Sequence, residues 1–93
     1  MKTGLRVHLL VSGKVQGVFF RLNTKNKAEE LGIFGWVKNL SDGKVEILVE
    51  GEKERIEELI KWVKKGPLFA KVKELEVEQR EFKGEFNFFE IKR

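Results

Sequence analysis

The sequence predicts an α+β fold in which two helices cover one face of an antiparallel sheet. Apolar residues recur with the period of two of a strand in one set of stretches and with a helical period in another. These stretches follow one another in the order strand, helix, strand, strand, helix, strand. The 93 residues contain no linker, repeat or low-complexity tract. We therefore expect a single domain over residues 1-93.

The N-terminal part predicts a strand, a loop and a helix. Every second residue from Leu5 to Val11 is apolar, as in a strand with one face on a core, and this strand should end near Ser12-Gly13. After the loop, one helical face is formed by residues at helical spacing, namely Phe20, Thr24, Ala28 and Leu31. Gly32 then ends the helix in the manner of a glycine after the last helical turn.

The middle of the chain predicts a β-hairpin and a second helix. Ser41-Asp42-Gly43 separates IFGWVKNL from KVEILVEG, a pattern typical of two antiparallel strands joined by an Asp-Gly turn. An i, i+3, i+4, i+7 apolar stripe then indicates a helix and consists of Ile56, Leu59, Ile60 and Val63. Gly66-Pro67 terminates this helix.

The C-terminal part predicts one irregular strand and a short extra strand. The apolar positions before residue 73 are out of phase with those after it, so we expect a bulge or bend near Lys73-Glu74. A turn is expected at residues 83–85, and FNFFEIKR resembles a short last strand. The order β-α-β-β-α-β is that of the ferredoxin-like sandwich. Because many functions share this fold, function has to be argued from a site.

Composition limits the classes of function. Without cysteine the chain offers no disulfide, no thiolate nucleophile and no thiolate metal site, and no stretch has the ~20 apolar residues of a membrane span or the pattern of a signal peptide. We therefore expect a cytoplasmic protein. The net charge of +4 suggests an anionic ligand, but Lys and Glu are interleaved, which favours solvated faces over a nucleic-acid surface. Abundant Lys and Glu also resemble thermophile composition.

The loop between the first strand and the first helix is the main candidate for a binding site. It reads GKVQGVFFR, and its two glycines let the backbone curl so that successive N–H groups converge on one anion. The helix N-terminus points its unpaired N–H groups to the same place, and Arg21 in the first turn adds a charged fork. Taken alone, a glycine-containing turn beside an arginine is more often structural. The loop matches neither the P-loop nor the dinucleotide fingerprint, so nucleotide binding has no support.

Asn39 is the second candidate and stands at the end of the strand before the Asp-Gly turn. An asparagine in such a place commonly bonds the local backbone. In the predicted topology the end of this strand can also lie near the first loop, where the amide would reach a bound phosphate. Both interpretations stay open at this point.

Other notable residues are expected to be structural. His8 lies on the non-core parity of its strand without a nearby carboxylate, which favours a surface residue over a general base. Trp36 and the phenylalanines are expected to pack in the core rather than to stack on bases. Glu46 and Glu50 are expected to be exposed carboxylates, so no metal site is predicted. Lys14 either adds positive potential to the anion site or is a solvated loop lysine.

Together these segments resemble the acylphosphatase signature. VSGKVQGVFFR, LGIFGWVKN and SDGKVEILVEG, from Val11 to Gly51, are similar to V-x-G-x-V-Q-G-V-x-F-R through G-W-V-x-N-x-x-D-G-x-V-E. The Gly-Pro after the second helix and the ending F-x-x-F-x-I are similar too, so the resemblance spans almost the whole chain. Ser41 departs from the Pro or Ala that this family often has. The resemblance implies hydrolysis of the carboxyl–phosphate bond of small acyl phosphates.

The resemblance also implies residue roles. Arg21 would bind the phosphate, and Asn39 would orient the attacking water. The backbone amides that would join Arg21 are those of Val15, Gln16, Gly17, Val18, Phe19 and Phe20. The leaving carboxylate is a weak base, so the reaction needs no general acid, and we expect a metal-independent enzyme without cofactors. Inorganic phosphate or sulfate would be a product-like ligand, and we expect a monomer. The alternative is a non-catalytic ferredoxin-like module that binds nucleic acid or an anion.

Overall fold

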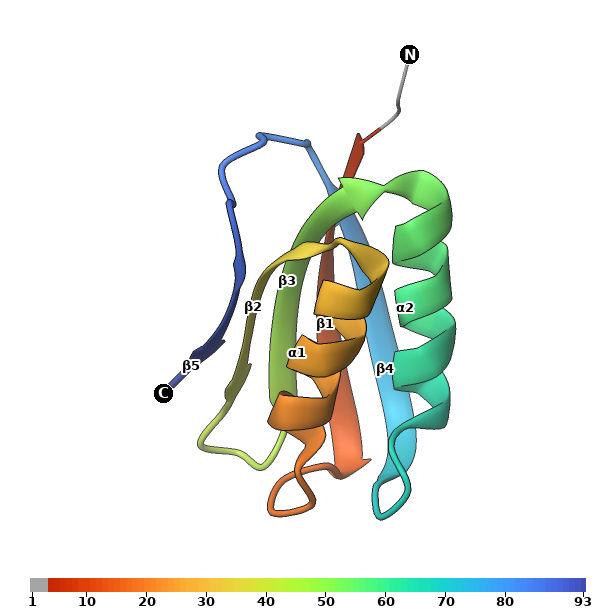
Figure 1. Cartoon of the computed structure of the whole chain (residues 1–93). Helices are drawn as coiled ribbons and strands as arrows, with labels where there is room; N and C mark the ends of the chain where they lie inside the picture. The colour runs from red at the N-terminus through yellow and green to blue at the C-terminus, as the bar shows by residue number, and fades with distance from the viewer. Residues whose placement is uncertain (1–3) are drawn as a thin grey trace.

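The structure is a computed structural model and describes residues 4–93. These residues form seven elements, which are β1 (Gly4–Lys14), α1 (Phe20–Leu31), β2 (Phe34–Asn39), β3 (Val45–Glu52), α2 (Lys53–Lys65), β4 (Lys71–Arg80) and β5 (Phe89–Lys92). The strands lie in one sheet in the order β4-β1-β3-β2-β5. Both helices cover the same face of this sheet (Figure 1). This arrangement confirms the predicted α+β sandwich.

The first four strands are antiparallel, as predicted, whereas β5 is not. β5 pairs in parallel with β2, with Phe89 opposite Gly35 and Ile91 opposite Val37. The reason is the connection of residues 81–88, which leaves β4 at one edge, crosses the end of the sheet and brings the chain to the other edge (Figure 1). The sheet is therefore mixed.

The bulge that the sequence predicts is confirmed and lies beside the first loop. Ser12 pairs with Glu74 and Gly13 with Val72, so Lys73 is the extra residue of β4. Gly13 has a φ of 124°, and a Cβ atom there would lie 2.2 Å from the carbonyl oxygen of Lys71. A glycine at this position is therefore needed for the close approach of β1 and β4 just before the chain enters the loop.

The core fills the space between the helices and the sheet. Every second residue of β1 from Val7 to Val11 is buried, together with the inward faces of β3 and both helices. The loop after β1 takes part, because Val15 is 1% exposed and Val18 is 8% exposed. Burial of these two side chains fixes the loop on the body of the domain.

Contacts on the helix-free face of the sheet show that the predictions for His8 and Glu50 were wrong. Nε2 of His8 lies 2.7 Å from Oε2 of Glu46, so His8 does have a carboxylate neighbour. Glu50 is 4% exposed and forms an ion pair with the buried Arg6, so it is not an exposed carboxylate. Both contacts arise from the pairing of β1 with β3, a register that sequence spacing alone does not reveal. Within residues 4–93, no group of three or more acidic or histidine side chains is placed to hold a metal ion.

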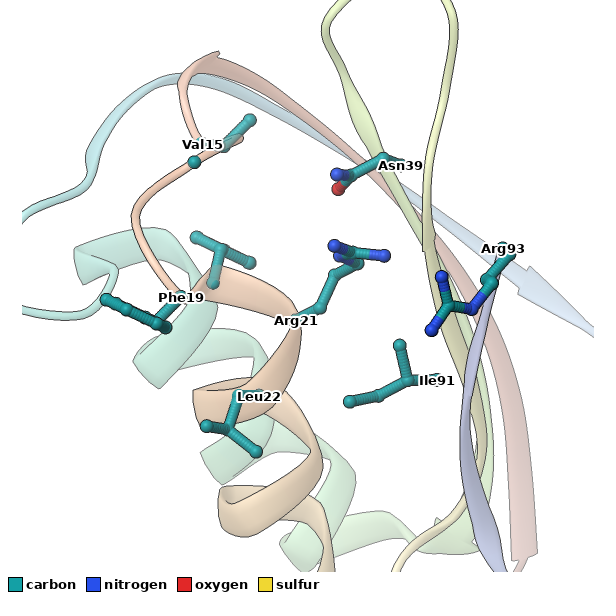
Figure 2. Close-up of a pocket in the computed structure, with 9 residues that line it drawn as sticks. Val15, Phe19, Arg21, Leu22, Asn39, Ile91 and Arg93 are labelled. Carbon is teal, nitrogen blue, oxygen red and sulfur yellow. The ribbon is translucent and has the colours of Figure 1, made fainter.

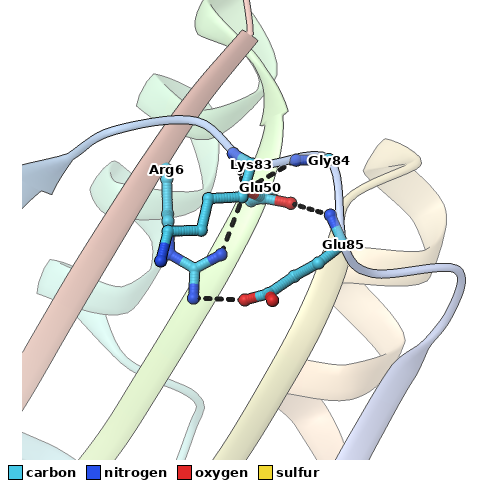
Figure 3. A network of polar contacts seen from close by, with 5 residues as sticks. All are labelled: Arg6, Glu50, Lys83, Gly84 and Glu85. Carbon is cyan, nitrogen blue, oxygen red and sulfur yellow. Dashed lines mark hydrogen bonds and ion pairs between the residues drawn. The ribbon is translucent and has the colours of Figure 1, made fainter.

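A polar network fastens the crossing connection to this face (Figure 3). The carboxylate of Glu50 accepts hydrogen bonds from the N–H groups of Lys83, Gly84 and Glu85 at 2.7, 3.1 and 3.1 Å. Arg6 donates to Glu50 at 3.1 Å and forms an ion pair with Glu85. The network holds the segment that leads to β5.

The prediction that Trp36 and the phenylalanines pack in the core is wrong for most of these residues. Trp36 is half-buried on the helix-free face, with the Nζ atoms of Lys38 and Lys92 at 5.4 and 4.9 Å from its ring centre. Phe20 and Phe89 are the buried phenylalanines of the described part of the chain. The exposed phenylalanines are Phe19, Phe34, Phe69, Phe82 and Phe88. No helix within residues 4–93 is long and apolar enough to cross a membrane.

Candidate active site

The loop between β1 and α1 combines two left-handed residues with backbone N–H groups that have no partner among the described residues. Gly17 and Phe19 both have left-handed backbone conformations, with φ of 74° and 60°. Such residues curl a chain so that its N–H groups converge. Within residues 4–93, no N–H group from Val15 to Phe20 donates a hydrogen bond. These donors and the positive end of α1 are therefore available to an anion.

A cavity of about 490 Å³ opens beside this loop (Figure 2). Its walls come from the loop, the first turn of α1, the end of β2 and the end of β5. The lining residues are Val15, Gly17, Phe19, Phe20, Arg21, Leu22, Asn39, Ile91 and Arg93. Six of the predicted site residues thus meet at one cavity. Gln16 and Val18 belong to the predicted loop but do not line it.

Arg21 supplies the positive charge that the sequence predicted. Its guanidinium points across the cavity toward the carboxamide of Asn39 (Figure 2). Within residues 4–93, Arg21 has no ion-pair or hydrogen-bond partner, and no acidic side chain lines the cavity. An unpaired guanidinium beside free N–H groups can form several charge-assisted hydrogen bonds to phosphate oxygens.

Asn39 lies at the last position of β2 and faces this charge. Its Oδ1 is buried without a hydrogen-bond partner in the described part of the chain. The turn that follows is closed by other groups, including the Leu40 N–H to the Lys44 carbonyl and the Lys44 N–H to the Asp42 side chain. The side chain of Asn39 is thus not used by the turn, which removes the purely local interpretation. A carboxamide can both donate and accept, so it can orient a water.

Gln16 joins the two parts of the site. Its Nε2 donates to the carbonyl oxygens of Leu40 at 2.8 Å and Lys44 at 2.9 Å. These two bonds tie the anion-binding loop to the turn that follows Asn39. The sequence suggested only a backbone role for Gln16, because the contact spans more than twenty residues and depends on the strand order.

Arg93 and the apolar residues Leu22 and Ile91 line the cavity and were not predicted. Ile91 and Arg93 arrive through the parallel pairing of β5 with β2. Strand alternation was the available signal, since Arg93 shares the parity of the buried Phe89. Strand alternation shows which face of the sheet Arg93 lies on, but it identifies the cavity only when the strand beside β5 is known.

Comparisons with known proteins agree with this geometry. The family model described as Acylphosphatase matches residues 7–91. The chain is similar to the acylphosphatase of Methylococcus capsulatus, with 47% identity over 95% of this chain and 96% of the relative, and to that of Pelotomaculum thermopropionicum, with 46% identity over 92% and 94%. It also resembles the crystal structure of acylphosphatase from Bacillus subtilis, with a TM-score of 0.92, 36% identity and coverage of 96% of this chain and 99% of the other. These similarities do not favour the non-catalytic alternative.

Proposed function

This chain belongs to the acylphosphatase family, and from that membership we propose that it hydrolyses small acyl phosphates to a carboxylate and inorganic phosphate. One observation supports the proposal above all others. Four residues of the loop, the guanidinium of Arg21 and the carboxamide of Asn39 border one cavity, and in the described part of the chain neither the loop N–H groups nor this guanidinium has a hydrogen-bond partner. This set matches the needs of phosphoryl transfer, in which positioning and charge stabilisation dominate.

In the proposed reaction, Arg21 and the N–H groups from Val15 to Phe20 hold the phosphoryl oxygens. They stabilise the charge that these oxygens carry as the bond to the acyl group breaks. An arginine in this role can raise the rate by about 10³- to 10⁵-fold. The proposal is supported by the proximity of these groups in the structure without substrate, which would keep reorganisation during the reaction small.

Asn39 is proposed to orient the water. The water oxygen attacks phosphorus opposite the acyl oxygen, the phosphorus–oxygen bond to the acyl group breaks, and its electron pair leaves on the carboxylate. The attacking water loses its proton to the phosphate or to solvent. The carboxylate is a weak base and leaves without a general acid, which suits a cavity without acidic or histidine side chains among the described residues.

The enzyme is further proposed to work without a metal ion and as a monomer. Support for metal independence comes from the chemistry of the site, because the guanidinium and the N–H groups provide the positive charge that a cation would otherwise supply. The test is hydrolysis of benzoyl phosphate with and without EDTA. Equal rates are expected, and loss of activity on chelation would contradict metal independence without contradicting hydrolysis itself. Size-exclusion chromatography tests the monomer.

The roles of the two polar residues predict an asymmetric result. Arg21→Ala should lower turnover of benzoyl phosphate by about 10³-fold or more and remove the affinity for inorganic phosphate, because the guanidinium binds the phosphoryl group itself. Asn39→Ala should abolish turnover but keep phosphate affinity near that of the wild type. Rates come from the steady state and affinities from isothermal titration calorimetry.

A matched control for Arg21 is available on the same helix. Lys25→Ala removes one positive charge from α1, but Lys25 pairs with Glu29 at 2.9 Å and does not line the cavity. This variant should keep both turnover and phosphate binding. Wild-type turnover in either Arg21→Ala or Asn39→Ala would refute the role of that residue.

A further inference from the structure

The turn between α2 and β4 exposes two large apolar side chains, which we call the apolar tip. Residues 67–70 form this turn, and the Ala70 N–H closes it by donating to the Pro67 carbonyl at 3.0 Å. The two central residues are Leu68 and Phe69, which are 88% and 67% exposed. Such positions are usually taken by Gly, Pro, Asn, Asp or Ser, which favour turn geometry. Neither the turn nor the core therefore explains why these two side chains are apolar.

Lysines flank the apolar tip along the chain and across the sheet. Residues 59–73 contain five lysines and no acidic residue. A sixth, Lys14 at the end of β1, lies directly opposite Lys71 at the start of β4, a pairing of like charges that destabilises a sheet. All six are exposed, and within residues 4–93 none of their side chains has an ion-pair or hydrogen-bond partner. This basic cluster consists of Lys14, Lys61, Lys64, Lys65, Lys71 and Lys73.

The apolar tip and the basic cluster lie at one end of the molecule. In Figure 1 the α2–β4 turn lies at the same end as the β1–α1 loop, opposite to the crossing connection of residues 81–88. Neither Leu68 nor Phe69 lines the cavity of the candidate site. The surface is therefore separate from that cavity, and it combines unpaired positive charge with exposed apolar area.

A partner for this surface has to be negatively charged and has to cover two apolar side chains on a turn. A bilayer with anionic headgroups offers both, because the headgroups attract lysines and the boundary with the acyl chains accepts apolar side chains. The cluster contains lysines alone, whereas the flat fork of arginine is preferred for recognition of nucleic acids. Leu68, the more exposed residue of the tip, has no ring that could stack on a base. These features favour a lipid surface over a nucleic acid.

We propose that the basic cluster and the apolar tip form a docking surface for membranes that contain anionic lipids. The lysines provide an attraction that weakens with salt, and the apolar tip provides the contact at short range. The contact is peripheral and reversible, and it needs no membrane-spanning segment. The proposal concerns a surface outside the cavity and does not rest on the hydrolysis proposed above.

The test is co-sedimentation of the whole chain with lipid vesicles. Vesicles of phosphatidylcholine alone are compared with vesicles in which about one third of the lipid is phosphatidylglycerol, since anionic lipid supplies the surface potential. We expect binding to the anionic vesicles to be at least about tenfold stronger than to the neutral ones at about 50 mM salt. This preference should be largely lost at about 0.5 M salt, because the charges are then screened.

Two double variants separate the contributions of charge and apolar contact. Lys64→Gln with Lys65→Gln should weaken binding to anionic vesicles by about 10- to 30-fold, because each lysine near such a surface contributes about fivefold. Leu68→Ser with Phe69→Ser should weaken it by about tenfold or more. Because all four side chains are exposed, both variants should keep the wild-type melting temperature.

Matched controls come from the opposite end of the molecule. Lys53→Gln with Lys83→Gln removes the same charge from exposed lysines that lie at the start of α2 and in the crossing connection. Phe88→Ser removes an apolar side chain that is 64% exposed. Both controls should bind anionic vesicles within about threefold of wild type. Equal losses in the controls and in the test variants would show a general effect of charge or of apolar area and would overturn the proposal.

A fluorescent label can locate the contact, because the chain has no cysteine of its own. A nitrobenzoxadiazole group on Leu68→Cys replaces the apolar bulk of the leucine, and the same label on Glu54→Cys reports on the other end of α2. Anionic vesicles should brighten the label at position 68 and shift its emission to shorter wavelength, and they should leave the label at position 54 unchanged. The same response at both positions, or a response at position 54 alone, would contradict docking through the apolar tip.

Two further outcomes would overturn the proposal. Equal binding of the wild type to neutral and anionic vesicles, or binding to neither, would show that the basic cluster does not attract a lipid surface. A duplex DNA oligonucleotide that binds more tightly than the anionic vesicles, with no loss in the Leu68→Ser and Phe69→Ser variant, would assign the basic cluster to a nucleic acid instead.

Discussion

Phe19 holds a left-handed backbone conformation at the N-terminus of α1, with φ of 60° and ψ of 24°. Within residues 4–93 it is the one non-glycine residue with positive φ. Such a conformation costs about 1–3 kcal/mol, and the ring is 71% exposed, so burial of its own side chain does not offset this cost. Its neighbours Val18 and Phe20 are buried and hold it in place. The strain lies in the loop whose residues border the cavity.

Gln16 shows how one side chain can set the geometry between two others. We predict that Gln16→Met, which keeps the volume but not the amide, lowers kcat by about 10- to 100-fold, because Asn39 shifts relative to the bound phosphate. Phosphate affinity should change by less than about threefold. The two lost hydrogen bonds should also lower the free energy of unfolding by about 2 kcal/mol. Steady-state kinetics, calorimetry and urea denaturation measure the three effects.

The control for this prediction is Lys44→Ala. The backbone carbonyl that accepts from Gln16 remains in this variant, so kcat should stay at the wild-type level. A Gln16→Met enzyme with normal kcat would show that the loop and the turn are held together by other contacts.

Residues of the site differ in how far the sequence predicts them. Arg21 and Asn39 were each ambiguous in their own short stretch of sequence, and the resemblance from Val11 to Gly51 made both of them candidates. Arg93 and the side-chain role of Gln16 depend on which strands are neighbours, and Glu50 was misjudged because its partner Arg6 is 44 positions away. Candidates within a continuous motif could be named from the sequence, whereas contacts made across the sheet could not.

At the level of elements, the crossing connection between β4 and β5 is held by one carboxylate. Burial raises the pKa of Glu50, but hydrogen bonds from the Lys83 N–H, the Arg6 guanidinium and two further N–H groups outweigh it, so the pKa lies below its ordinary value. In Arg6, burial lowers the pKa, but its bonds to Glu85 and Glu50 raise it on balance. The pair is therefore charged at neutral pH.

This network predicts a pH-dependent contribution to stability. A carboxylate whose pKa is lowered on folding stabilises the folded state, and this contribution is complete at pH values above the unfolded pKa, here 4.5. The contribution is lost as the pH falls through the lower pKa of the folded state. Glu50→Gln should therefore lower the free energy of unfolding at pH 7 by about 2–3 kcal/mol. The difference from wild type should narrow in urea denaturation below the unfolded pKa, toward about pH 3.

A carboxylate on the same sheet face serves as the comparison. Glu76 is exposed and has no ion-pair partner among the described residues, so Glu76→Gln should change the free energy of unfolding by less than about 0.5 kcal/mol at any of these pH values. If the free energies of unfolding of wild type and Glu50→Gln differed by the same amount from neutral to acidic pH, titration of Glu50 would not contribute to stability.

The helices and strands were predicted from the periodicity of apolar residues, and the errors in these predictions also come from relying on periodicity. The helices end at Gly32 and Gly66 as expected, and the bulge at Lys73 was visible as a change of phase. Periodicity does not give the direction of an edge strand, so the parallel pairing of β5 was missed. Trp36 was wrongly expected in the core, although the alternation with the buried Val37 assigns Trp36 to the helix-free face.

At the level of the whole molecule, β5 links folding to the site. The strand closes the sheet at the free edge of β2, and the Gly35 N–H donates to the Phe88 carbonyl at 3.1 Å where the two strands meet. Phe89 buries its ring in the common core, with 3% exposed, while Arg93, which directly follows this strand, lines the cavity. A domain of this size has a total stability of only about 5–14 kcal/mol, so the burial of one ring is a large part of it.

We predict that Phe89→Ala lowers the free energy of unfolding by about 3–5 kcal/mol and the melting temperature by about 15 to 30 °C, because it leaves a cavity and frees the strand. The exposed neighbour provides the control, since Phe88 is 64% exposed and Phe88→Ala should cost less than about 0.5 kcal/mol. Calorimetric melting measures both variants. A variant that melts like the wild type would show that the Phe89 ring adds nothing to the stability of the core.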